Sequence, residues 1–135
     1  MLDKLDHIGI AVNSIEEIKS FFQQVFNLSP VFEEIVPEQK VKVVGFLIGD
    51  SKLEFLEPTS TDSPVAKFLD KKGQGIHHLA VEVKNIDQIL KRMKSKHIQL
   101  IDEEAKIGVA GKKIAFIHPK STFGVLLELT EKKLK

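Results

Sequence analysis

The chain contains an internal repeat, and each copy places a histidine near its start. The segment DHIGIAVNSIE, which begins at Asp6, returns as HHLAVEVKNID, which begins at His77, so that His78 follows His7 by 71 residues. This offset is about half of the 135-residue chain. A repeat unit that cannot bury its apolar face alone must pack against its copy, so the halves are predicted to form one pseudo-symmetric body. His7 and His78 thereby become candidates for one shared site.

Each half of the chain shows the same order of secondary-structure signals. An alternating strand pattern at Leu5–Val12 precedes a helix that Ser14 caps, and the pattern at Ile76–Val83 precedes a helix that Asn85 caps. Three strand-like runs follow each helix, at residues 31–36, 41–48 and 52–57 in the first half and 98–103, 112–118 and 124–130 in the second. The sequence therefore predicts an α+β fold of two tandem βαβββ modules.

The two modules, at about residues 1–60 and 74–135, are expected to form a single domain. A short linking helix is predicted between them at about 63–72, because Pro64 suits a first helical position and Gly73 suits a stop. No low-complexity tract or flexible linker separates the modules. If the strands of both modules curve, they enclose a pseudo-symmetric half-barrel cleft.

The composition excludes several classes of protein. The absence of cysteine removes disulfides, thiolate nucleophiles and cysteine-based zinc sites. Twenty basic and nineteen acidic residues leave a net charge of +1, so no broad field recruits nucleic acid or an anionic membrane. No run approaches the roughly 20 apolar residues that span a bilayer, and the first residues lack the apolar core of a signal peptide. We expect a cytoplasmic protein with no nucleic-acid or membrane partner.

Two glutamates interrupt apolar runs in the last predicted strand of each module, Glu54 in KLEFL and Glu128 in VLLEL. A carboxylate inside an apolar strand requires a partner. Each glutamate closes its module as His7 and His78 open theirs, so the four side chains can converge in the predicted cleft. Two imidazoles and two carboxylates form a ligand set for a divalent first-row metal, and octahedral coordination would leave two positions for water or substrate.

Each of these residues has a plainer interpretation when it is considered alone. A single strand histidine is more often a hydrogen-bonded structural residue, and a strand glutamate often faces solvent; the duplicated placement favours the metal site. His77 points to the opposite face from His78 and is interpreted as a structural residue or as one that supports a metal ligand without binding the metal. Lys120, in the segment HPKSTF, is a candidate for binding an anionic substrate group. No Ser-His-Asp arrangement can be argued from the spacing.

At these residues the chain resembles the vicinal oxygen chelate superfamily of paired-βαβββ metalloproteins, which includes glyoxalase I. Within that superfamily it is most similar to the methylmalonyl-CoA epimerases. The strand histidines mark only the superfamily, whereas the middle and C-terminal segments are more specific. The resemblance is carried by DHIGIAV, DSPVAKFL, GIHHLAVEV and IGVAGKKIAFIHPKSTFGVLLELTE.

The resemblance implies a glyoxalase-like fold and exchange of the 2R and 2S forms of methylmalonyl-CoA in a homodimer. The acyl-CoA substrate loses a proton to form an enolate, which a metal ion stabilises. Cobalt is the first expectation for this ion, with manganese, nickel or zinc as alternatives. The resemblance assigns the metal ligands to His7, Glu54, His78 and Glu128.

One departure from the family pattern concerns the groups that transfer protons. Some family members have a further glutamate base on the strand matched here by residues 41–48, where this chain has Val43. One transfer step must then use Glu128, a metal-bound water, or a polar residue near the entrance of that strand. Glu128 is the preferred catalytic residue, and Gln39 is a candidate substrate-binding residue. The polar residues considered at the entrance are Glu38, Gln39 and Lys42.

Two other classes of function remain open. One is another enzyme of the superfamily, either a glyoxalase-like isomerase or a dioxygenase. The dioxygenases use two histidines and one carboxylate, so the additional Glu54 argues against that chemistry. The other is a non-enzymatic protein whose cleft binds a small molecule, and an intact metal quartet counts against it. Fold alone does not decide between these functions.

Overall fold

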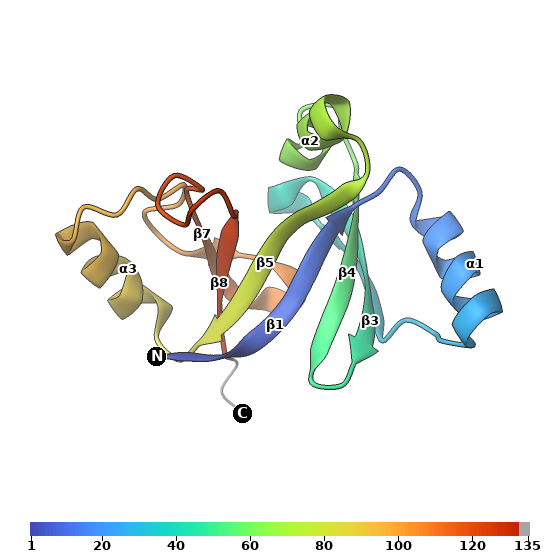
Figure 1. Ribbon diagram of the computed structural model, residues 1–135, viewed down its shortest axis with the longest axis horizontal. Helices are drawn as coiled ribbons and strands as arrows, with labels where there is room; N and C mark the ends of the chain where they lie inside the picture. The colour runs from blue at the N-terminus through green and yellow to red at the C-terminus, as the bar shows by residue number, and fades with distance from the viewer. Residues whose placement is uncertain (133–135) are drawn as a thin grey trace. The chain divides into compact units, whose positions relative to one another are not determined.

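The computed structural model describes residues 1–132, which fall into two compact units. The N-terminal unit comprises His7–His77, and the C-terminal unit combines Met1–Asp6 with the chain from His78 onward. Each unit contains one βαβββ module, which confirms the predicted α+β class (Figure 1). None of the described helices is long and apolar enough to cross a bilayer.

The N-terminal unit builds a four-stranded sheet in the order β2-β3-β4-β1, with α1 against one face. Strands β1 and β4 run parallel, whereas β2 and β3, and β3 and β4, run antiparallel. The side chains between α1 and the sheet include three stacked or edge-on phenylalanine rings, Phe22, Phe46 and Phe55. The elements are β1 (Leu2–Ala11), α1 (Ile15–Phe26), β2 (Phe32–Val36), the short helix η1 (Pro37–Gln39), β3 (Val41–Ile48) and β4 (Ser51–Pro58).

The C-terminal unit repeats this plan with the strand order β5-β8-β7-β6. Strands β5 and β8 are parallel, and β8, β7 and β6 are joined antiparallel. Helix α3 packs on an aliphatic core that contains Val83, Ile86, Leu90 and Leu129. The elements are β5 (Gly75–Val83), α3 (Ile86–Ser95), β6 (Lys106–Ile107), the short helix η2 (Val109–Gly111), β7 (Lys113–Ile117) and β8 (Leu127–Glu131).

The first turns of α1 and α3 are stabilised in the same way. The predicted caps are confirmed, since Ser14 Oγ accepts from the amide of Glu17 at 3.2 Å and Asn85 Oδ1 accepts from the amide of Gln88 at 3.1 Å. A glutamate from the last strand of each module adds a second bond. Glu57 accepts from the amide of Ile15 at 2.8 Å, and Glu131 accepts from the amide of Ile86 at 3.0 Å. These carboxylates satisfy helix amides that would otherwise lack partners.

The linking helix α2 spans Pro64–Lys72. Ser63, which is fully buried, caps it by accepting from the amide of Val65, and Gly73 ends it with φ of 75°. His77, in the first half of β5, lies edge-on to the ring of Phe68 with 5.0 Å between centroids. This ring contact supports the structural interpretation of His77.

The prediction of a strand at residues 98–103 is wrong. Only an isolated bridge between Leu100 and Ile117 forms there, and the short strand β6 comes later. The amides of Ile101 and Asp102 both donate to the carbonyl of Phe116, while Asp102 Oδ2 accepts from the Phe116 amide at 2.8 Å. A side chain that accepts a hydrogen bond from a strand amide replaces the backbone partner of that amide, and regular strand pairing ends there. Strand β8 also begins three residues later than predicted, at Leu127, because a hydrogen-bonded loop occupies the preceding residues.

Candidate functional site

The first candidate pair, His7 and Glu54, lies within the N-terminal unit. His7 Nδ1 is 3.3 Å from Glu54 Oε2, and the two residues are 5% and 2% exposed. Glu54 stands opposite Gly9 on β1 and opposite Gly45 on β3. Because side chains alternate along a strand, His7, Gly9 and Ala11 share one face of β1, and of these three only the histidine has a polar side chain.

The second candidate pair, His78 and Glu128, lies within the C-terminal unit. His78 Nε2 is 3.1 Å from Glu128 Oε1, and the two residues are 4% and 5% exposed. Glu128 stands opposite Ala80 on β5 and opposite Phe116 on β7. The ring of Phe116 meets the imidazole of His78 edge-on at 5.4 Å and covers one side of the pair. The register of this pair therefore repeats that of His7 and Glu54.

The residues of each pair fit a metal ligand set by their chemistry. In each pair the imidazole nitrogen lies about 3.2 Å from the carboxylate oxygen. At this distance the two atoms can form a hydrogen bond with one another, or both can bind one cation. Taking a carboxylate out of water is costly unless an opposite charge accompanies it, so two such buried pairs at matching positions require a compensating group. A divalent cation would be suited to supply that charge.

Glycine is required at position 45 by the packing beside Glu54. A Cβ built on Gly45 would lie 2.1 Å from Cε1 of Phe32, so the ring of Phe32 occupies the space that a side chain would need. The N-terminal pair is thus bordered by an aromatic ring from β2, and the C-terminal pair by the aromatic ring of Phe116.

The entrance of β3 carries three of the sequence candidates. Glu38 is exposed, Gln39 is half-buried, and the ammonium of Lys42 lies 3.3 Å from Glu33. Ser63 Oγ donates to the Gln39 carbonyl at 3.4 Å, which ties this segment to the start of α2. Val43 is fully buried and has no group that could carry a proton.

A salt bridge next to Gln39 adds a second tie to the same segment. Lys40 pairs with Asp62, in the loop before α2. The hydrogen bond from Lys40, together with that from Ser60, lowers the pKa of Asp62 to about 2. The segment from Pro37 to Lys40 is therefore fixed by contacts with the loop that leads into α2.

Lys120 lies on the loop that joins β7 to β8, and its side chain is exposed. Its amide donates to Nδ1 of His118 at 3.1 Å. The loop ends at Leu126, whose carbonyl accepts from the amide of Leu79 at 3.1 Å. Lys120 thus belongs to a loop that runs directly into the strand that carries Glu128.

Glu82 and Thr130 are among the buried polar residues that sequence reasoning missed. They are 8% and 2% exposed and stand opposite one another on β5 and β8. Glu82 follows His78 by four residues and Thr130 follows Glu128 by two, so all four side chains share one face of this sheet. The alternation of each strand carried this signal in the sequence.

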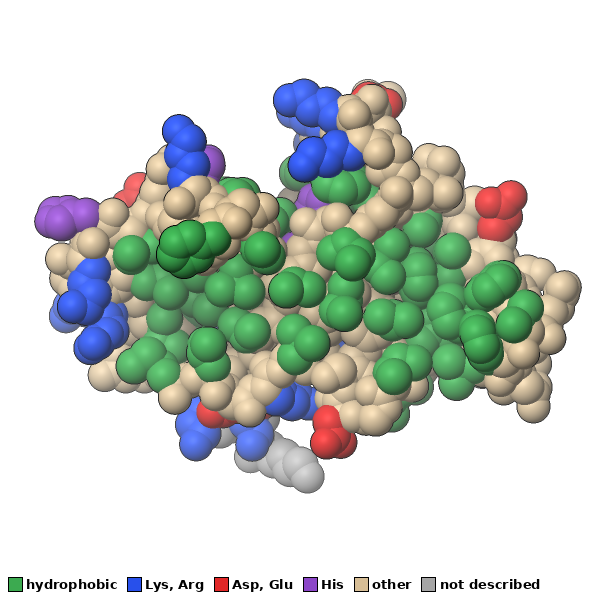
Figure 2. Space-filling view, viewed as in Figure 1, with side chains coloured by type: hydrophobic (Ala, Val, Ile, Leu, Met, Phe, Trp, Pro, Cys, Tyr) green, Lys and Arg blue, Asp and Glu red, His purple; other side chains and the backbone are tan. Residues whose placement is uncertain are grey.

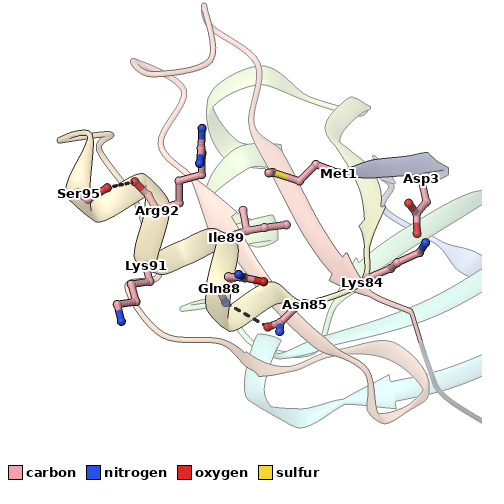
Figure 3. A pocket seen from close by; sticks show the side chains of 9 residues that line it. All are labelled: Met1, Asp3, Lys84, Asn85, Gln88, Ile89, Lys91, Arg92 and Ser95. Atoms are coloured by element: carbon pink, nitrogen blue, oxygen red, sulfur yellow. Dashed lines mark hydrogen bonds between the residues drawn. The ribbon is translucent and has the colours of Figure 1, made fainter.

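One surface pocket lies away from the candidate pairs. It has a volume of about 540 Å³ and is lined mainly by α3 and the first residues of the chain, with Lys84, Lys91 and Arg92 around it (Figure 3). Figure 2 shows basic side chains over α3 at the left edge and hydrophobic side chains over α1 at the right. The exposed side chains of α1 include Phe21 and Phe26. Neither surface contains a candidate metal ligand.

Comparisons with known proteins identify the family to which the chain is similar. Residues 6–116 match the Glyoxalase/Bleomycin resistance protein/Dioxygenase superfamily. The chain is 49% identical to the uncharacterized protein YqjC of Bacillus subtilis, over 98% of this chain and 94% of that protein. It is 40% identical to the mitochondrial methylmalonyl-CoA epimerase of Bos taurus, over 96% of this chain and 75% of that protein.

A solved structure extends the similarity to the whole described fold. It is a single-substitution variant of the Streptomyces coelicolor methylmalonyl-CoA epimerase in complex with 2-nitronate-propionyl-CoA. The TM-score is 0.92 at 33% identity, and the match covers 98% of this chain and 96% of that one. Similarity in sequence and in fold therefore points to the same group of proteins.

Proposed function

This chain belongs to the glyoxalase superfamily and, within it, to the methylmalonyl-CoA epimerases, and on that premise we propose that it interconverts 2R- and 2S-methylmalonyl-CoA. The observation that carries the proposal is the duplicated imidazole–carboxylate pair, buried in both modules at the same register. Such a pair provides ligands and a proton-transfer group, which are the two requirements of this chemistry.

The proposed reaction inverts the carbon between a thioester and a carboxylate. Its proton must leave from one face, and another must return from the opposite face of the planar enolate. Glu128 is the proposed proton-transfer group, because it combines a carboxylate with a buried position beside His78. The side chain of Val43 is apolar and fully buried, so it cannot act as a base.

We assign His7, Glu54, His78 and Glu128 to one divalent metal centre. Two nitrogen and two carboxylate ligands suit cobalt, manganese, nickel or zinc, and cobalt is the first expectation from the family resemblance. When bound, the ion would offset the negative charge that develops on the substrate oxygens as the proton leaves. The assignment of both pairs to one ion rests on the internal repeat and on family membership.

Lys120 and Gln39 are the proposed substrate-binding residues. The exposed ammonium of Lys120 is suited to an anionic group of the acyl-CoA, and Gln39 belongs to a segment that Ser63 and Asp62 hold in place. We also propose a homodimer, in keeping with the family resemblance. Light scattering at micromolar concentration checks it, and the mass of a single chain would contradict it.

Deuterium exchange tests the proposed reaction directly. The metal-loaded protein is incubated with methylmalonyl-CoA in deuterated water, and incorporation at the second carbon is followed by mass spectrometry. We expect exchange with the unchanged protein and none with His78→Ala, while His77→Ala retains it. Binding of the thioester without any exchange would instead favour a non-enzymatic binding protein.

A further inference from the structure

The loop between β7 and β8 contains Phe123, whose exposure and backbone conformation are both unusual for a phenylalanine. Phe123 is 99% exposed, and its backbone has φ of 60°, in the left-handed region that bulky residues rarely adopt. The left-handed backbone conformation is unfavourable for folding, and the exposed ring gains no free energy from burial that would offset it. Stability alone would favour glycine at this position, as at the next residue, Gly124, with φ of 94°. The ring therefore requires an explanation outside the folded chain.

The loop that carries Phe123 is rigidly braced by hydrogen bonds. Gly124 donates its amide to the Pro119 carbonyl at 2.8 Å, and the Thr122 hydroxyl donates to the Val125 carbonyl at 2.5 Å. At the base of the loop, Ser121 Oγ accepts from the amide of Gln99 at 2.9 Å. A braced loop presents its side chain in a fixed place, so that binding costs little conformational entropy.

The same loop adjoins the C-terminal candidate pair. Its last residue, Leu126, accepts a hydrogen bond from Leu79, the neighbour of His78. Glu128 follows Phe123 by five residues, a span of at most about 17 Å of extended chain. Figure 1 shows this loop in red beyond the upper ends of β7 and β8. A ligand that reaches Glu128 from this end of the strands must pass close to the loop.

We propose that Phe123 is a stacking platform for the adenine base of the CoA substrate, and that Lys120 binds the phosphates of the same nucleotide. The inference rests on the proposed function, because only an acyl-CoA substrate brings an adenine nucleotide to this loop. An aromatic ring stacks on any nucleobase, and the exposed Lys120 supplies the charge that phosphates require.

The other module supports a role specific to this loop. There, the corresponding connection between β3 and β4 is a tight turn at Gly49 and Asp50, with no aromatic side chain. The internal repeat therefore does not require a nine-residue loop with an exposed ring. The extension is confined to the module that carries Glu128.

Two substrates, one with and one without the adenine nucleotide, distinguish a loss of base stacking in a Phe123 variant from a general effect on the enzyme. The kinetics of Phe123→Ala are measured with methylmalonyl-CoA and with methylmalonyl-pantetheine, which lacks the adenine nucleotide. We expect KM for the CoA thioester to rise roughly tenfold with little change in kcat, and both constants for the pantetheine thioester to stay unchanged. Phe123→Trp should restore the low KM, and Phe26→Ala, which removes an exposed ring on α1, should have no effect.

Several outcomes would overturn the platform. These are an unchanged KM for the CoA thioester, an equal rise for both thioesters, or a change of oligomeric state by light scattering. If neither thioester is turned over, the proposed function fails, and calorimetric titration with CoA alone decides the inference. A roughly tenfold weaker affinity of Phe123→Ala for CoA would then support the platform, and equal affinities would overturn it.

Discussion

The two modules keep the same imidazole–carboxylate pair but surround it differently. Both also retain the helix caps and the glutamates that bind the first turns of α1 and α3. The residues beside the pairs differ: the N-terminal unit has Gly45, Ala11 and Leu56, where the C-terminal unit has Phe116, Glu82 and Thr130. Folding and the proposed metal binding account for the shared positions. The differing positions are where an asymmetric substrate would need different contacts.

The largest expected effect comes from removing either histidine. His7→Ala and His78→Ala should each lose the bound metal and reduce the exchange rate by more than about a hundredfold. If the two pairs hold one ion, each substitution abolishes all metal binding, whereas two separate ions would leave half. Elemental analysis distinguishes these results, with His77→Ala as the control that keeps full occupancy. Full occupancy in His78→Ala would remove the quartet from consideration.

The second prediction compares the two glutamates. The proposal gives Glu54 only a ligand role, whereas Glu128 also transfers a proton. Glu54→Gln retains a ligand oxygen, so it should keep metal and lose less than about tenfold in rate. Glu128→Gln should lose about a hundredfold or more at equal metal content, because an amide cannot accept the substrate proton. Equal losses in the two variants would contradict a special role for Glu128.

Glu38→Ala sharpens the same comparison. Glu38 is the exposed carboxylate at the entrance of β3, near the position where the family resemblance places a base. If Glu128 carries the transfer, this substitution leaves the rate within a few fold. A fall of about a hundredfold with unchanged metal content would transfer the role to Glu38.

The fourth prediction concerns the parts of the modules that match. Glu57→Ala and Glu131→Ala each remove a charged acceptor from the first turn of a helix. Each should lower the free energy of unfolding by about 1–2 kcal/mol, and by similar amounts. Urea denaturation measures both, with the exposed Glu16→Ala as a control that changes stability little. A lower free energy of unfolding in only one of the two variants would show that the two glutamates do not stabilise their helices equally.

The internal repeat explains why much of the fold could be predicted from the sequence. Alternation located β1 and β5, side-chain chemistry located the caps at Ser14 and Asn85, and the interrupted apolar runs located Glu54 and Glu128. Each of these signals occurs twice. A local pattern that recurs at a constant offset is more informative than either copy alone.

The features that the sequence did not predict depend on contacts between distant residues. The predicted strand at residues 98–103 failed because Asp102 bonds to the backbone of Phe116, which no local pattern reports. The left-handed conformation of Phe123 belongs to a loop that is closed by hydrogen bonds such as that from Gly124 to Pro119, and no local pattern reports them. Alternation places Glu82 on the same face of β5 as His78, but the burial of that face depends on packing that no local pattern reports.

The smallest expected effects are the pH responses of one surface ion pair in each unit. In the N-terminal unit, the hydrogen bond from Lys40 lowers the pKa of Asp62 to about 2. In the C-terminal unit, the hydrogen bond to Asp87 raises the pKa of Lys113 above its ordinary 10.5. All four side chains are substantially exposed, so salt should weaken both pairs.

The two ion pairs should therefore fail at opposite ends of the pH scale. Asp62 binds its proton more weakly in the folded chain, so its contribution to stability is present above its ordinary pKa of 3.8 and is lost as the pH falls toward 2. Lys113 binds its proton more tightly when folded, so its contribution is present below 10.5 and is lost as the pH rises through the raised pKa. NMR titration measures both midpoints. Lys40→Met should return the Asp62 midpoint toward 3.8, and Asp87→Asn should return that of Lys113 toward 10.5. An Asp62 midpoint already near 3.8 with Lys40 intact would mean that this contact does not persist in solution, and only the Lys113 response would remain.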